Sequence, residues 1–297
     1  YSYKTLSVLV CLSLAACGGG GGGGGTGGGG VAVTPPPPSG PVIGPSGHEY
    51  HGINDTTPRV IQLGGAALRN RTTGRDTVQV NGQLEQPSGA LVVSDPDYVL
   101  SDPSGRDGTG TATDANGATV QTSDLGGYEY LTVGTMDYVT AAGPTTSVIV
   151  IGAITQPTDM PVTGQVTYTG TTVVDEFSPN CQCRHEGTAT VNSDFQNGTV
   201  QVTLDGFTTT STNASLPPDQ NFDRVILADM SITGSQISGG TAVTELNGTE
   251  VTLYGPNPDV SIDGTFYGLD HVGNPDEVGG VFVIDGTGAL MGVFVAD

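Results

Sequence analysis

The stretch that decides the fold is Gly264-Thr265-Phe266-Tyr267-Gly268, followed by Glu277-Val278-Gly279-Gly280-Val281-Phe282 and, near the end of the chain, by Gly292-Val293-Phe294. Each segment joins aromatic and β-branched residues to glycine, a pattern typical of strands that bend sharply or approach a neighbouring backbone closely. We expect the phenylalanines to face a core and the glycines to let a small barrel turn its corners. The motif residues, interpreted as structural and without a catalytic role, are Gly264, Phe266, Tyr267, Gly268, Glu277, Gly279, Gly280, Phe282 and Phe294.

Residues 154–297 around this stretch are predicted to form an eight-stranded antiparallel β-barrel. The expected strands are Gln165–Val173, Gly187–Asp194, Thr199–Asp205, Arg224–Ile232, Gly240–Leu246, Val260–Tyr267, Val278–Ile284 and Ala289–Val295. Asn197-Gly198 is a strong hairpin-turn signal, and Asp285-Gly286 begins the turn before the last strand. Eight antiparallel strands close naturally into a barrel whose interior is filled by side chains.

A second β-rich region, residues 48–153, precedes the predicted barrel. Its expected strands are Arg59–Leu63, Thr77–Val80, Ala90–Val93, Tyr128–Val133 and Ser147–Ile151. Residues 101–127 are rich in Gly, Asp and Thr, which indicates either a mobile loop or a pair of weakly formed strands. All seven phenylalanines lie between Phe177 and Phe294, so the larger aromatic core is expected in the barrel. The fold class predicted for the chain is therefore all-β.

The motif resembles the β-barrel domain of transferrin-binding protein B-like surface lipoproteins, in which a Gly-x-Phe-Tyr-Gly, Glu-x-Gly-Gly-x-Phe and Gly-x-Phe series closes the barrel. The stretch from Met160 to Gly170 is similar to the segment that opens it, so the resemblance covers roughly residues 150–297. It implies that residues 48–153 are a handle-like region. The classical receptor has two lobes, whereas this chain has room for one at most. Nothing here matches the host-protein-binding loops of that receptor, so the resemblance does not name a ligand.

The opening of the chain has the form of a lipoprotein signal peptide. Lys4 precedes a short apolar stretch that ends in Leu14-Ala15-Ala16-Cys17. The stretch is too short for a membrane-spanning helix, which needs about 20 residues. We predict that residues 1–16 are removed, that Cys17 is lipidated, and that residues 17–47 form a Gly/Pro-rich tether. A plain secretory signal is the alternative.

Composition excludes several classes of partner. The 297 residues carry a formal net charge of −22, and the only lysine, Lys4, lies in the predicted signal. Such a surface repels nucleic acid and anionic lipid headgroups, so contact with the membrane is expected through the lipid anchor only. The charge is interpreted as a solvated acidic coat, with attraction of a basic partner or of divalent cations as the alternative.

Cys181, Cys183 and His185 form the cluster with the most chemical character. An exported protein meets oxidising conditions, so the two cysteines could form a disulfide if the chain turns there. Free or intermolecular thiols are a second interpretation, and a soft-metal or haem site that uses His185 as well is a third. A structural zinc site needs four ligands and the sequence shows no partner pair, so no cofactor is expected.

Two charged clusters carry weaker signals. Arg69, Arg71 and Arg75 could hold an anion, although we interpret them as balancing nearby acids such as Asp76. The spacing of five aspartates in glycine-rich loops matches no calcium-binding signature, so they are interpreted as solvated. These aspartates are Asp95, Asp97, Asp102, Asp107 and Asp114.

The sequence favours a binding protein over an enzyme, because it contains none of the common hydrolase, metalloprotease or phosphate-loop patterns. We predict a lipoprotein on the outer membrane of a Gram-negative bacterium, at the cell surface. Its ligand is expected to be a host or environmental protein, haem or another iron-linked molecule. The alternative is a structural or adhesive surface lipoprotein without a dedicated ligand site.

Overall fold

The computed structural model describes residues 41–53, 55, 57–71, 74–86, 90–94, 99–102, 111–113, 119–123, 128–140, 143–178, 181–211 and 221–297. Within these ranges all the regular secondary structure is β-strand. The same residues contain no helix that is long and apolar enough to cross a membrane. The predicted signal peptide, Cys17 and most of the predicted tether lie outside the described residues, as do Asp95, Asp97, Asp107 and Asp114.

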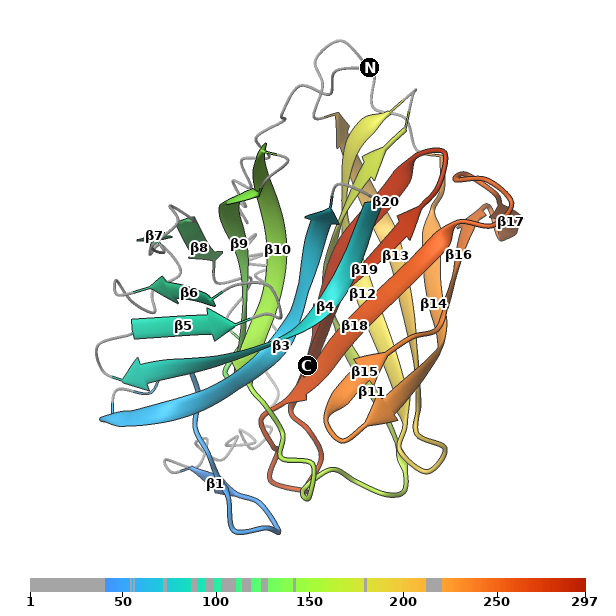
Figure 1. The fold of residues 1–297 in the computed structure, drawn as a ribbon. Coiled ribbons are helices and arrows are strands. Elements are labelled where there is room, and N and C mark those ends of the chain that lie inside the picture. Colours follow the sequence, from blue (N-terminus) through green and yellow to red (C-terminus); the bar gives the residue numbers. More distant parts are fainter. Residues whose placement is uncertain are drawn as a thin grey trace, which may run out of the picture.

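The second half of the chain forms a closed barrel of antiparallel strands (Figure 1). Around the wall the eight strands are β13 (Thr199–Ser211), β12 (Gln182–Asp194), β11 (Gln165–Phe177), β20 (Ala289–Ala296), β19 (Glu277–Asp285), β18 (Asp259–Tyr267), β15 (Gln236–Ser238) and β14 (Arg224–Thr233). Pairing of β13 with β14 closes the ring. The predicted all-β fold with an eight-stranded antiparallel barrel is confirmed, and Gly198 lies in the predicted hairpin turn with a φ of 66°.

One wall strand differs from the prediction. The sequence predicts Gly240–Leu246 as the fifth barrel strand, whereas β15 fills that place by pairing with both β14 and β18. β16 (Thr241–Leu246) continues along β14 and pairs on its other side with β17 (Thr249–Val251) instead of β18. The break falls at Gly239 and Gly240, whose φ angles of 72° and 103° favour glycine.

The barrel interior is filled mainly by aromatic and aliphatic side chains. Phe222, Phe266, Phe282 and Phe294 are fully buried there, among side chains contributed by all the long wall strands. Alternate residues of each strand point inward, as the period of two requires. The concentration of phenylalanine in the second half of the sequence therefore reflects the filling of the barrel.

A second sheet precedes the barrel in the sequence and has the strand order β6-β5-β4-β3-β10-β9-β8-β7. Its strands are β3 (Arg59–Arg71), β4 (Gly74–Gln86), β5 (Ala90–Ser94), β6 (Val99–Asp102), β7 (Thr111–Thr113), β8 (Thr119–Ser123), β9 (Leu131–Thr140) and β10 (Gly143–Ala153). We call it the first sheet. β3 and β4 are 13 residues long, so they extend well past the predicted segments. The polar stretch 101–127 contains the paired strands β7 and β8.

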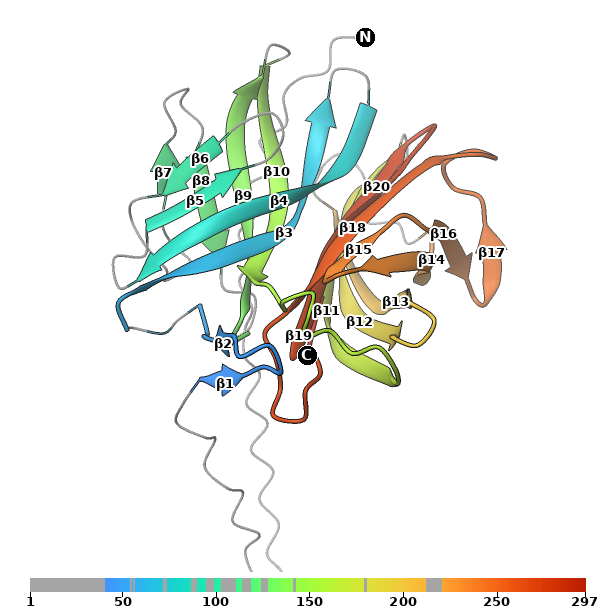
Figure 2. The ribbon, with the colours of Figure 1, turned by 60° about the horizontal axis from the view of Figure 1, so that its bottom comes forward.

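A small hairpin lies ahead of the first sheet. β1 (Val42–Ile43) pairs with β2 (Glu49–Tyr50), so paired structure begins before residue 48, within the segment predicted as tether. The hairpin is held against the β10–β11 connection, because the Tyr50 hydroxyl and Ser46 Oγ donate to Asp159 at 2.8 and 2.7 Å. The hairpin and the β18–β19 loop lie at the same end of the molecule (Figures 1 and 2).

The first sheet packs against the outer face of β18, β19 and β20 (Figure 2). Outward side chains of the barrel, including Val281, Val283 and Val293, share a core with Val80 and Ile149 of the first sheet. The first eight residues of β19 are all buried, because the barrel interior covers one face and the first sheet covers the other. The two sheets therefore form one structural unit with two adjoining cores.

Gly279 and Gly280 of the motif lie on opposite faces of β19. A Cβ atom on Gly280 would lie 2.6 Å from Cζ of Phe294 inside the barrel. A Cβ atom on Gly279 would lie 2.8 Å from Cγ1 of Val150 in the first sheet. Both positions need glycine because side chains of the barrel interior and of the first sheet approach the backbone of β19 closely from its two faces.

Candidate functional site

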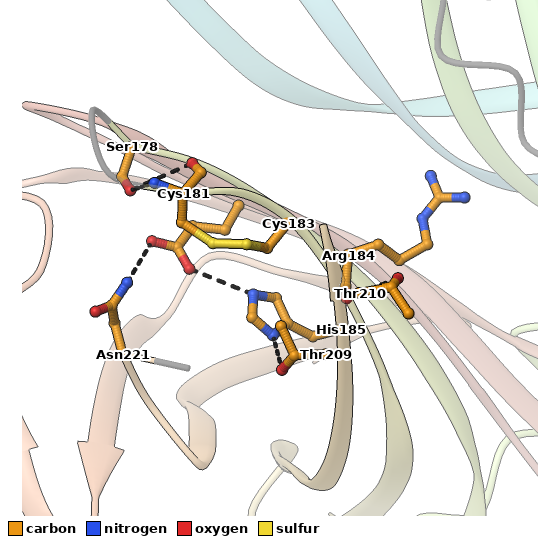
Figure 3. Close-up of a disulfide and its surroundings, with 9 residues drawn as sticks. Ser178, Cys181, Cys183, Arg184, His185, Thr209, Thr210 and Asn221 are labelled. Atoms are coloured by element: carbon orange, nitrogen blue, oxygen red, sulfur yellow. Dashed lines mark hydrogen bonds and ion pairs between the residues drawn. A yellow bond between two sulfur atoms is a disulfide. The ribbon is translucent and has the colours of Figure 1, made fainter. Parts of the chain in front are cut away.

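The cysteine cluster lies at the end of the barrel opposite the β1–β2 hairpin (Figures 1 and 3). Cys181 and Cys183 are joined by a disulfide, with their Cα atoms 5.4 Å apart. Ser178 shapes the turn before them, because its backbone N–H donates to the carbonyl of Cys181 at 2.8 Å and its Oγ accepts from the N–H of Cys181 at 3.0 Å. Both cysteine side chains are buried in the barrel.

His185 lies one inward position further along β12, at the centre of a polar chain. Its Nε2 atom is 3.3 Å from Oε2 of Glu176 on β11, and its Nδ1 atom is 2.9 Å from Oγ1 of Thr209 on β13. Asn221 donates to the other oxygen of Glu176 at 3.2 Å (Figure 3). The glutamate and the histidine are 1% and 0% exposed, so the chain of contacts that crosses three neighbouring strands is closed to solvent at its centre.

Aromatic side chains surround this polar chain. The His185 ring lies 4.7 Å from the ring of Phe222 and 6.0 Å from that of Phe207. Tyr254, in the connection between β17 and β18, is also buried, and its hydroxyl has no hydrogen-bond partner in the structure. Burial raises the pKa of Tyr254, and the nearby charge of Glu176 raises it further. The ionised form of Tyr254 is therefore strongly disfavoured.

This arrangement does not supply a set of metal ligands. Thiolates bind soft metals, but both sulfur atoms are used in the disulfide, and both nitrogens of His185 have partners. Within the described ranges no group of three or more His, Cys, Asp or Glu residues is placed to hold a metal ion.

Two arginines near this end of the barrel, Arg184 and Arg75, are paired with acids. Arg184 makes a two-pronged contact with Asp175, at 2.8 and 2.9 Å, which raises the pKa of the guanidinium. Arg75 lies 3.6 Å from Asp285 and above the ring of Phe177. Arg69 is opposite Asp76 in the register of β3 and β4. Of the three arginines of the predicted cluster, Arg75 is the one whose side chain is described, and its acidic partner here is Asp285.

Removing the disulfide tests its contribution to the barrel. Replacing both cysteines by alanine in residues 41–297 should lower the free energy of unfolding by about 1.5 kcal/mol, because the closed loop is very short. Urea denaturation measures the loss, and reduction of the unmodified protein should reproduce it. An unchanged midpoint in both experiments would contradict the prediction.

Three residues of the site have no signal in the sequence. Glu176, Thr209 and Asn221 come from separate strands and connections, and only the closed barrel brings them to His185. Alternation along β12 could have placed Cys183 and His185 on the same inward face. Glu277, which the motif assigns to barrel closure, also accepts hydrogen bonds from the backbone N–H groups of Glu129, Tyr130 and Leu131, where the chain enters β9.

Comparison with known proteins identifies the barrel. Residues 160–297 match the family described as C-lobe and N-lobe beta barrels of Tf-binding protein B. A search of curated protein sequences found no match. Over these residues the chain is therefore similar to the β-barrels of Tf-binding protein B.

Solved structures similar to a large part of the chain include a mutant of transferrin-binding protein B from Haemophilus parasuis. It has 17% identity and a TM-score of 0.49, over 79% of this chain and 45% of that one. Isotype 1 transferrin-binding protein B from serogroup B Neisseria meningitidis has 15% identity and a TM-score of 0.40, over 75% and 52%. The haemoglobin receptor HpuA from Kingella denitrificans has 12% identity and a TM-score of 0.34, over 82% and 89%. The chain thus spans less than half of the first of these structures.

Proposed function

We propose that the mature chain is a lipid-anchored binding protein on the outer membrane of a Gram-negative bacterium, at the cell surface. Its ligand is a host or environmental protein, haem or another iron-linked molecule. The observation that carries this proposal is the similarity of residues 160–297 to the β-barrels of Tf-binding protein B. The lipobox-like Leu14-Ala15-Ala16-Cys17 and the glycine-rich segment after it support anchoring through Cys17.

The packing of the barrel favours ligand capture on its outside. Side chains such as Phe222, Phe266 and Phe282 fill the interior, so a protein ligand has to meet the rims and turns. The chain enters through the β1–β2 hairpin, at the end that carries the β10–β11 and β18–β19 connections (Figure 2). A tether attached there turns the opposite end, with the β16–β17 and β19–β20 turns, away from the membrane.

A binding panel with two insertion variants tests the proposal. Residues 41–297, immobilised through the N-terminus, are exposed to transferrin, haemoglobin and haemin, and binding is followed by interferometry. A Gly/Ser insertion at Asn247-Gly248 should abolish capture, because this β16–β17 turn lies at the end proposed to face away from the membrane. The same insertion at Gly273-Asn274, in the β18–β19 loop at the opposite end, should preserve capture, because surface turns tolerate inserted residues. If neither these probes nor proteins from host serum bind, the structural or adhesive alternative gains support.

We also propose that the protein is not a catalyst. Glu176, His185 and Thr209 follow the order acid, base and hydroxyl, which acyl-transfer enzymes use. A substrate has to reach the base and the nucleophile, and His185 is fully buried between Phe207 and Phe222. The contacts of His185 are those of a core residue whose two nitrogens are both occupied.

Haem titration tests whether His185 binds the iron of haem. Addition of haemin to the wild type and to His185→Asn should give the same Soret absorbance at each ratio, because the imidazole is enclosed and hydrogen-bonded. Circular dichroism checks that the variant remains folded. A Soret band shift that is present in the wild type and lost in the folded variant would contradict this prediction.

A further inference from the structure

The barrel wall is joined over its shortest length between β15 and β18, and we call this pairing the seam. The residue pairs of the seam are Gln236 with Thr265, Ile237 with Gly264 and Ser238 with Asp263. β11 and β12, by contrast, are joined along 13 pairs. Local opening costs least where few bonds have to break, so the seam is the part of the wall that most needs support from outside.

Gln79, on β4 of the first sheet, lies over the central pair of the seam. Its Nε2 atom is 3.2 Å from the carbonyl oxygen of Ile237 on β15 and 3.1 Å from that of Gly264 on β18. The same nitrogen is 3.2 Å from Oδ1 of Asp263, and Oε1 of Gln79 accepts from Oγ1 of Thr265 at 3.4 Å. One amide group of the first sheet therefore bonds both strands of the seam.

These contacts need an amide at position 79. The Nε2 group is a donor with two hydrogens, and the three oxygens around it are all acceptors. A carboxylate of the same shape has no hydrogen to give and would face two carbonyls and the carboxylate of Asp263. Substitution by glutamate therefore turns an attraction across the seam into a repulsion.

Two further residues of β4 bind the same side of the barrel. Thr77 is 7% exposed, its N–H donates to Oγ of Ser261 on β18 at 3.1 Å, and its Oγ1 donates to Oδ2 of Asp263 at 2.6 Å. The backbone N–H of Arg75 donates to Oδ2 of Asp285, at the end of β19, at 3.1 Å. Alternate residues of β4 thus form a continuous polar contact with the barrel that ends at the seam.

We propose that the first sheet is a clasp that keeps the barrel closed, and that Gln79 is the residue through which it holds the seam. When the first sheet leaves the barrel, Ile237 and Gly264 lose the bonds to Gln79 and the seam depends on its own backbone pairing. β15 continues through Gly239 and Gly240 into β16, which carries the β16–β17 turn. The clasp therefore also fixes the base of that turn.

Hydrogen exchange of backbone amides, followed by NMR, tests the proposal in residues 18–297, which omit only the predicted signal and the lipidation site. The reporters are the N–H groups of Phe266 and Gly239, which donate across the two ends of the seam to the carbonyls of Ser235 and Ile262 at 2.9 and 3.2 Å. In Gln79→Glu these amides should exchange about tenfold faster or more, because bonds that include one to a charged group are lost. Amides of β11 and β12 should keep their wild-type rates.

Gln83→Glu is the matched control. Gln83 lies on the same strand with an exposed side chain, and its amide donates to Oε1 of Gln62 at 3.4 Å. This variant introduces the same charge and should leave exchange at the seam unchanged. Equal seam rates in Gln79→Glu and Gln83→Glu overturn the proposal, as does an equal acceleration of all barrel amides in Gln79→Glu, which would mean a loss of global stability.

A disulfide across the seam gives a second measurement. Gln236 and Thr265 are neighbours of the hydrogen-bonded pair Ser235 and Phe266, so they form a non-hydrogen-bonded pair, whose Cα atoms lie about 4.5 Å apart, within the range of a disulfide. Oxidised Gln236→Cys with Thr265→Cys, added to Gln79→Glu, should return the seam amides to wild-type rates. Exchange that stays fast with the disulfide formed would show that the seam does not open, and would overturn the proposal.

Discussion

Replacing Gly280 by valine should lower the free energy of unfolding of the protein by about 3 kcal/mol, at the upper end of the usual cost of overpacking a core. The new side chain would point into the barrel, where its Cβ atom alone would lie 2.6 Å from Cζ of Phe294 and 2.7 Å from the carbonyl oxygen of Asp263. Phe294 is fully buried and cannot move aside without displacing its neighbours. The backbone of β18 limits movement on the other side.

Chemical denaturation of the variant measures this loss. The matched control is Gln201→Val, which places the same side chain at a solvent-exposed position of β13 and should change stability by less than about 0.5 kcal/mol. If Gly280→Val and the control were equally stable, the close approach of β18 and Phe294 to β19 would not constrain that position.

Separating residues 154–297 from the rest of the chain should turn a monomer into a self-associating barrel. The outer face of β18, β19 and β20 carries Val281, Val283, Val293 and Val295, which the first sheet covers in the whole protein. An exposed apolar patch of that kind drives association in water. We expect the fragment to elute as oligomers or aggregates in size-exclusion chromatography with light scattering, and residues 41–297 to elute as a monomer.

A redesigned fragment distinguishes exposure of this face from simple unfolding. Threonine at positions 281, 283 and 293 retains β-propensity and removes much of the apolar surface. The redesigned fragment should remain folded by circular dichroism and elute as a monomer. A native-sequence fragment that is monomeric and as stable as the whole protein would show that the first sheet contributes little to the barrel.

The parts of the fold that the sequence predicted are those with a local signal. Asn197-Gly198 and Asp285-Gly286 marked their turns, and alternation together with the phenylalanine distribution marked the long barrel strands. The fifth wall strand was misplaced because β15 has only three residues and runs into β16 in the same register. Its length carries too little pattern to separate it from its continuation.

The site was harder to predict because its contacts depend on the closed fold. Cys183 and His185 were recognisable as a pair of chemical groups, but Glu176 and Thr209 reach the histidine from neighbouring strands. Glu277 belonged to a motif whose other members fill the barrel, and nothing in the motif shows that its carboxyl group binds residues 129–131. Contacts between separate sheets leave no periodic trace in either segment.

The short β15 strand gives the barrel a mechanical polarity. On one side of the ring, β11 and β12 are joined along 13 residue pairs, whereas β15 and β18 are joined along three. A pulling force on β16 and β17 would reach this three-pair seam first and unzip the wall there, while the long pairing across the ring stayed intact. The barrel is thus a sheet wrapped into a cylinder whose closing strand is held by a short pairing, and that pairing lies toward the end that carries the β18–β19 loop and the β1–β2 hairpin.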